Sequence, residues 1–221
     1  MKNFFLCCSV LFCLLSVRAQ AEGRFTVLLD AGHGVETPGK RSPDGFREAV
    51  WCRSEVQELR QSLSQSEFDV FCVTPEDEDV KIPERVARIN KVCDERGAKN
   101  CLLISLHCNA SPGQGWHSAC GFMVFVSEKN ASNNSKRFAQ LIFDEAERHR
   151  LLGNRSIPAE HYWQKDLGIL RDSHCPAVLI EAGFMDCKTD LDFLRSNLGQ
   201  QTIVEMTVNA IRAYKAELGI D

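Results

Sequence analysis

Phe25-Thr26-Val27-Leu28-Leu29-Asp30-Ala31-Gly32-His33-Gly34 is the segment of the chain that says most about its fold. Its first five residues form a short apolar run rich in strand-forming side chains, which predicts a buried strand. The two glycines that flank His33 permit a tight turn directly after that strand. We therefore expect a polar side chain, His33, just beyond the end of a buried strand.

The residues that follow predict a βαβ unit. Residues 35–46 are rich in Gly, Pro, Ser and charged residues, which indicates a loop. From Glu48 onward, apolar residues recur at roughly helical spacing, and residues 68–73 return to strand character. The apolar positions of this expected helix are Val50, Val56, Leu59 and Leu63. A strand, a helix and a second strand in this order are typical of a parallel sheet.

The remainder of the chain continues the alternation of strands and helices. Pro83 suits the first turn of a helix that ends near Gly97, and the other expected elements are strands at 101–106, 121–126, 167–170 and 177–180 and helices at 135–149 and 203–218. About six strands interleaved with four or five helices predict one three-layer α/β domain. Its sheet is mixed or mostly parallel and carries helices on both faces. We find no internal repeat and no linker.

Composition excludes several classes of protein. The chain has 221 residues, of which 44% are hydrophobic and 25% charged, so it can build one sizeable core and is neither disordered nor fibrous. Its 26 Lys and Arg against 30 Asp and Glu give a formal net charge of −4. An acidic chain of this kind gives no indication of a nucleic-acid partner.

Residues 1–21 resemble a cleaved secretory signal peptide. Lys2 precedes the apolar run from Phe4 to Val17, and the small-residue segment Ala19-Gln20-Ala21 follows it. The run is shorter than the ~20 residues needed to span a bilayer. We expect a periplasmic or secreted protein with no membrane association after cleavage, and a mature domain over residues 22–221.

Cysteine usage leaves two interpretations open. Three of the eleven cysteines leave with the signal peptide, and the other eight include no C-x-x-C pair. Several of them lie in or beside apolar runs, where cysteine often serves as a small buried hydrophobe. An oxidising compartment would also permit disulfides, but the sequence does not select a pairing.

Three polar residues stand where predicted strands stop: His33, His107 and Glu181. Open α/β sheets place their sites beyond such strand ends, and Glu48 opens a helix that could reach the same edge. Two imidazoles and a carboxylate form a known catalytic Zn²⁺ set that leaves one position open, which favours His33, Glu48 and His107 as ligands. Glu181 is then available as the base that takes a proton from a zinc-bound water.

Each of these residues also has an ordinary structural explanation. A histidine between glycines can be a turn residue, and a glutamate at a helix start is stabilised by the helix dipole. A histidine at a strand end can be a hydrogen-bonded core residue. The case for a site therefore depends on all four residues together.

Four segments resemble motifs of the zinc-dependent N-acetylmuramoyl-L-alanine amidases of type 3. In chain order they are Val27-Leu28-Leu29-Asp30-Ala31-Gly32-His33-Gly34, Gly45-Phe46-Arg47-Glu48, Ile104-Ser105-Leu106-His107-Cys108-Asn109-Ala110 and Pro176-Ala177-Val178-Leu179-Ile180-Glu181-Ala182-Gly183-Phe184. Arg85 to Asn90 and Leu167 to Arg171 are weaker matches. Cys108 and Ala49-Val50-Trp51 depart from the family pattern, but neither departure removes a ligand.

The resemblance implies the metal ligands His33, Glu48 and His107 and the catalytic residue Glu181. It also implies a secreted enzyme that hydrolyses the amide between N-acetylmuramic acid and L-alanine in peptidoglycan or its muropeptide fragments, with Zn²⁺ as cofactor. Asn109 and Arg155 are candidate substrate contacts. The alternatives are a zinc peptidase or deacetylase that acts on another wall bond, or a catalytically silent wall-binding domain.

Some members of the family carry an inserted helix that covers the zinc until a partner removes it. In this chain the corresponding stretch, residues 127–134, is too short for such a helix. Residues 150–165, the other candidate for a lid, are interrupted by Gly153 and Pro158. We therefore expect no activator protein.

Overall fold

The computed structural model describes residues 24–64 and 68–220. The predicted signal peptide at 1–21 lies outside these residues. The described residues contain one six-stranded sheet in the order β2-β1-β3-β6-β4-β5. Its strands are β1 (Phe25–Ala31), β2 (Phe68–Cys72), β3 (Cys101–Asn109), β4 (Met123–Ser127), β5 (Trp163–Lys165) and β6 (Ala177–Phe184).

The sheet is mixed, as the sequence predicts. β1 lies between β2 and β3 and is parallel to both, and β3 is parallel to β6. β4 is antiparallel to β6, and β5 is parallel to β4. The carboxyl ends of β1, β3 and β6 therefore meet at one edge of the sheet, where an α/β protein places its site.

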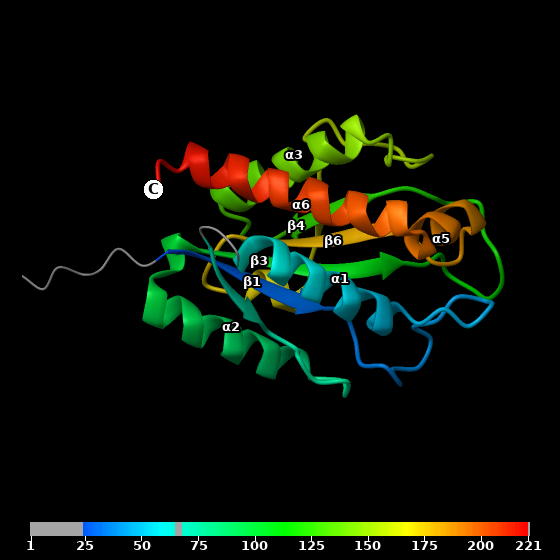
Figure 1. Ribbon diagram of the computed structural model, residues 1–221, viewed down its shortest axis with the longest axis horizontal. Coiled ribbons are helices and arrows are strands. Elements are labelled where there is room, and N and C mark those ends of the chain that lie inside the picture. The colour runs from blue at the N-terminus through cyan, green and yellow to red at the C-terminus, as the bar shows by residue number, and fades with distance from the viewer. Residues whose placement is uncertain (1–23, 65–67, 221) are drawn as a thin grey trace, which may run out of the picture.

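Helices cover both faces of the sheet (Figure 1), so the predicted single α/β domain is confirmed. One face packs against α1 (Glu48–Ser64), α3 (Asn133–Arg148) and α6 (Asn197–Glu217), whose apolar side chains share the larger core cluster. The other face packs against α2 (Ile82–Arg96) and the single turn α4 (Gly168–Arg171). A short 3₁₀ turn, Ala98–Asn100, leads into β3.

Two expectations about local structure need correction. The predicted strand at 167–170 is wrong, because these residues begin with Leu167 as the helix N-cap and continue as α4. Such a short apolar run does not distinguish a strand from a buried helical turn, and here Ile169 and Leu170 pack into the cluster that contains α2. The sixth strand is β5 instead, in a stretch that we expected to be a loop.

The helix α5 (Lys188–Arg195) was not predicted from the sequence. It has only two buried apolar residues, Leu191 and Leu194, which is too few for a clear periodic pattern. Within the described residues, no helix is both long and apolar enough to cross a membrane.

Candidate active site

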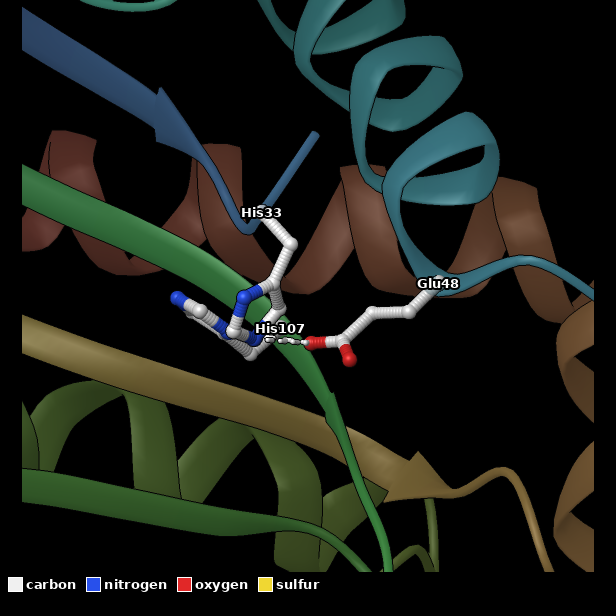
Figure 2. Close-up of side chains that lie close together, drawn as sticks. All are labelled: His33, Glu48 and His107. Atoms are coloured by element: carbon white, nitrogen blue, oxygen red, sulfur yellow. Dashed lines mark hydrogen bonds and ion pairs between the residues drawn. The ribbon is translucent and has the colours of Figure 1, made fainter. Parts of the chain in front are cut away.

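The structure brings His33, Glu48 and His107 together from three different elements. His33 follows β1, Glu48 is the first residue of α1 and His107 lies on β3. One potential ligand atom from each residue lies within 4.8 Å of the others. His107 Nδ1 is 2.9 Å from Glu48 Oε1, and His33 Nε2 is 3.6 Å from the same oxygen. Figure 2 shows the three side chains pointing toward one another.

The backbone around His33 is specialised for this position. His33 has a φ of 56°, in the left-handed region that few residues other than glycine adopt, at a cost of about 1–2 kcal/mol. The preceding residue, Gly32, lies against the His107 ring, and a Cβ at that position would be 2.5 Å from His107 Nδ1. The tight turn therefore allows Gly32 to pack against the His107 imidazole while the His33 imidazole points toward the same site.

A buried ion pair holds the end of β1 in place. Arg85 Nη1 is 3.0 Å from Asp30 Oδ1 and also donates to the Ala31 carbonyl at 2.7 Å. Ser105 Oγ donates to the other Asp30 oxygen at 2.6 Å. Both charged side chains are buried, so these contacts fix the strand ends from which His33 and His107 extend.

The charge state of His33 and the unpaired oxygen of Glu48 suit a metal ion. Burial lowers the pKa of His33 to about 4, so its imidazole is neutral, the form that binds metals. Glu48 Oε1 accepts from the Cys108 amide at 3.1 Å. Glu48 Oε2 is buried and has no hydrogen-bond partner among the described residues. Two imidazoles and a carboxylate with a spare oxygen fit an open Zn²⁺ site.

Glu181 stands beside this group. It lies directly opposite His107 in the parallel pairing of β3 with β6, so both side chains point to the same face of the sheet. Burial raises the pKa of the Glu181 carboxyl to about 7. Its Oε2 is buried without a hydrogen-bond partner among the described residues. A carboxyl group in this environment can take up and release a proton near neutral pH.

A cavity of about 420 Å³ opens over these residues. His33, His107 and Glu181 line its floor, and residues of α2, α4 and β5 contribute to its walls. Lys40 and Lys165 also line it. Neither lysine forms an ion pair with another described residue, so their charges are available to a ligand.

The two candidate substrate contacts lie apart from the cavity lining. Asn109 is at the end of β3, past a register shift that follows His107, and its amide donates to Met123 Sδ at 3.4 Å. Arg155 is exposed in the loop between α3 and β5. Neither side chain is among the residues that line the cavity. Their roles stay predictions.

Sequence reasoning missed several residues that shape the site. Asp30 and Arg85 anchor it, and Lys40 and Lys165 line it. The sequence signals for Asp30 were its place in the first family motif and its charge inside an apolar strand, which is costly unless that charge has a partner. The two lysines are separated in sequence by more than a hundred residues, and no local pattern joins them.

Comparison with known proteins identifies the family. A family model described as N-acetylmuramoyl-L-alanine amidase matches residues 27–213. The chain belongs to this family. The match begins in β1 and ends in α6, so it includes all four residues of the candidate active site.

Two curated relatives of this chain carry names that describe a function. It is 25% identical over 194 residues to a probable cell wall amidase, LytH, of Staphylococcus saprophyticus, which covers 87% of this chain and 59% of the relative. It is 29% identical over 171 residues to the endolysin of Bacillus phage SPP1, covering 77% and 59%. The chain thus spans less than two thirds of the length of either relative.

Solved structures share the fold of this chain. An N-acetylmuramoyl-L-alanine amidase from Clostridium difficile 630 superimposes with a TM-score of 0.75 at 22% identity, over 87% of this chain and 97% of that one. The catalytic domain of CwlV, an amidase from Bacillus (Paenibacillus) polymyxa, gives a TM-score of 0.71 at 20% identity, over 89% and 99%. The fold is therefore that of known amidase domains.

Proposed function

We propose that this chain is a zinc-dependent N-acetylmuramoyl-L-alanine amidase. It hydrolyses the amide between the lactyl group of N-acetylmuramic acid and the L-alanine of the stem peptide. The observation that carries the proposal is that His33, Glu48 and His107 converge, with Glu181 directly opposite His107 on the neighbouring strand. His33, His107 and Glu181 line one cavity. The choice of the bond that is cleaved is based on membership of the family.

His33, Glu48 and His107 would hold the zinc ion. When bound, Zn²⁺ would act as a Lewis acid that polarises the amide carbonyl and lowers the pKa of water, so that a nucleophile is available near pH 7. The protein keeps the two imidazoles in fixed positions through the His33 turn and the Asp30–Arg85 pair. These supports matter because a small displacement of a catalytic group lowers the rate steeply.

Glu181 would carry the proton. Ionised, its carboxylate takes a proton from the attacking water, and the resulting carboxylic acid then donates that proton to the leaving nitrogen of L-alanine. Its raised pKa keeps both forms accessible near pH 7.

Lys40 and Lys165 would bind carboxylates of the stem peptide. Stem peptides carry free carboxylates beyond the L-alanine residue, and a lysine without an internal ion-pair partner can bind such a group by a charge-assisted hydrogen bond. The cavity therefore suits an anionic peptide.

The proposed location of the enzyme is outside the cytoplasm, in the periplasm or as a secreted protein. Relatives named cell wall amidase and endolysin support action on the wall. The signal-like segment at 1–21 supports export but lies outside the described residues.

Digestion of purified muropeptides, followed by mass spectrometry, tests the function. The zinc-loaded protein should release the intact stem peptide with a free L-alanine amino group. Cleavage within the peptide, or loss of an acetyl group, would instead indicate a zinc peptidase or a deacetylase. Binding to peptidoglycan without any product would indicate a silent wall-binding domain.

A further inference from the structure

The cysteines of the described residues gather into groups of neighbours from distant parts of the chain. Cys52 lies beside Cys108, and Cys93 lies between Cys101 and Cys175. Cys120 lies beside Cys187. The eighth cysteine is Cys72, and burial raises the pKa of its thiol. All eight are present as free thiols.

Cys120 and Cys187 form the group that an oxidant can reach. The other two groups consist of buried cysteines, whereas Cys120 is only half-buried. The two sulfur atoms and one carboxylate oxygen of Asp190 lie within 4.8 Å of one another. Both cysteines pack in one small apolar cluster with Met123 and Phe184.

The backbone on both sides of this pair is already fixed. Asp190 Oδ2 accepts from the Gly121 amide at 2.7 Å and from the Phe184 amide at 2.8 Å. The His117 amide donates to the Asp186 carbonyl at 2.8 Å. In Figure 1, the segment that follows β3 passes beside α5 at the end of β6. The two sulfurs, which lie within 4.8 Å of each other, would have to approach to the ~2.05 Å of a disulfide.

A disulfide explains this cluster better than a second metal ion. Structural zinc sites are closed by four protein ligands. Among the described residues, the cluster offers three, Cys120, Cys187 and Asp190. One oxygen of Asp190 is also held by two backbone amides.

We propose that Cys120 and Cys187 form a disulfide bond in the exported protein. The inference rests on the extracytoplasmic location in the proposed function, since a reducing cytosol would keep the thiols apart. A disulfide-containing oxidant drives the step by thiol–disulfide exchange. The two cysteines lose two protons and two electrons as the S–S bond forms, and the disulfide of the oxidant accepts both and becomes a dithiol.

The disulfide would stabilise the pairing of β4 with β6, the strand that carries Glu181. Met123 on β4 lies opposite Glu181 on β6, and Cys120 and Cys187 flank this pair in sequence. A disulfide here joins the segment that enters β4 to the N-cap of α5, just after β6. It therefore limits separation of the two strands beside the active site.

Peptide mapping of the purified protein after incubation with oxidised glutathione tests the proposal. The expected result is a protein that loses the mass of two hydrogen atoms and yields a peptide cross-linked between Cys120 and Cys187. Cys120→Ser and Cys187→Ser should each abolish that peptide, whereas the matched control Cys72→Ser should retain it. Reduction should lower the Tm by about 5–10 °C in the wild type and in Cys72→Ser, but not in the other two variants.

Three results would overturn the bridge. One is a folded, oxidised protein in which both thiols still react with a maleimide. Another is a cross-link from either cysteine to a different partner. The third is a second equivalent of zinc, held with both thiols intact and released by Cys120→Ser and Asp190→Asn. Because these readouts do not depend on catalysis, failure of the bridge and failure of the amidase activity are distinguishable.

Discussion

His107 and Glu181 face the same side of the sheet from directly opposite positions on β3 and β6. This register places the proposed metal ligand His107 and the proposed proton-transfer group Glu181 on neighbouring rigid strands. Their separation is therefore set by backbone hydrogen bonds and not by loops, which favours precise positioning.

Glu181→Gln should abolish most activity while it leaves the metal in place. Glutamine has nearly the same shape but cannot accept the proton of the attacking water, so kcat should fall by about 100-fold or more. Muropeptide hydrolysis and elemental analysis on the same sample check both parts. Loss of zinc from Glu181→Gln would make Glu181 a ligand and contradict the division of roles.

His107→Ala should release the zinc ion, because it leaves an open site with only His33 and Glu48 as protein ligands. The expected result is less than a tenth of an equivalent of zinc after dialysis, with no detectable hydrolysis. His174→Ala, at an exposed histidine outside the cavity, is the control and should keep a full equivalent. Full zinc occupancy in His107→Ala would refute the ligand assignment.

Lys165→Gln should weaken binding of stem peptides that carry free carboxylates. Loss of one charge-assisted contact should raise KM about 5–20-fold, with a smaller effect on kcat. A substrate whose carboxylates are amidated should show no such difference between wild type and variant. Lys91→Gln, at an exposed lysine of α2 outside the cavity, provides the matched control. An equal KM increase for both substrates would show that Lys165 does not read the carboxylate.

The sequence indicated which four residues lie together at the candidate site better than it indicated the elements around them, for a physical reason. His33, Glu48, His107 and Glu181 each sit in a local motif at the end of an apolar strand or the start of a helix, so their positions follow from element order alone. The turn α4 and the strand β5 are too short for periodicity to define. The positions of Lys40 and Lys165 in the cavity depend on how a loop and a strand that are distant in sequence pack together, which no local pattern predicts.

Glu55→Gln should stabilise the folded protein and change the pH dependence of its stability. The Glu55 side chain on α1 is fully buried, and neither carboxyl oxygen has a hydrogen-bond partner among the described residues. Burial, assisted by the charge of Glu58, raises its pKa from 4.5 to about 8. Between these values the unfolded chain releases the proton and the folded protein retains it, so stability falls as pH rises.

Urea unfolding at pH 5 and pH 7.5 measures this effect. In the wild type, Glu55 should lower the free energy of unfolding by at most about 1.4 kcal/mol per pH unit. The variant should lose that slope, whereas Glu58→Gln, at an exposed neighbour, should largely retain it. Identical pH profiles for wild type and Glu55→Gln would show that Glu55 is ionised in the folded protein.

The enzyme should cleave soluble muropeptides without an activator protein. β4 ends at Ser127 and α3 begins at Asn133, so the connection at 128–132 has no room for a helix over the cavity. Residues 149–162 likewise contain no helix. Turnover by the purified, zinc-loaded protein alone is the expected result. Activity that starts only after proteolysis or addition of a second protein would contradict it.

Because His33 has a left-handed backbone conformation, the residue that would be most stable at this position differs from the residue that activity requires. Glycine would relieve the strain at φ 56° and make the fold more robust, yet it would remove one imidazole. Directed evolution for heat resistance alone should therefore enrich His33→Gly, while selection for wall lysis should eliminate it. His33 thus destabilises the turn but provides an imidazole that the proposed reaction requires.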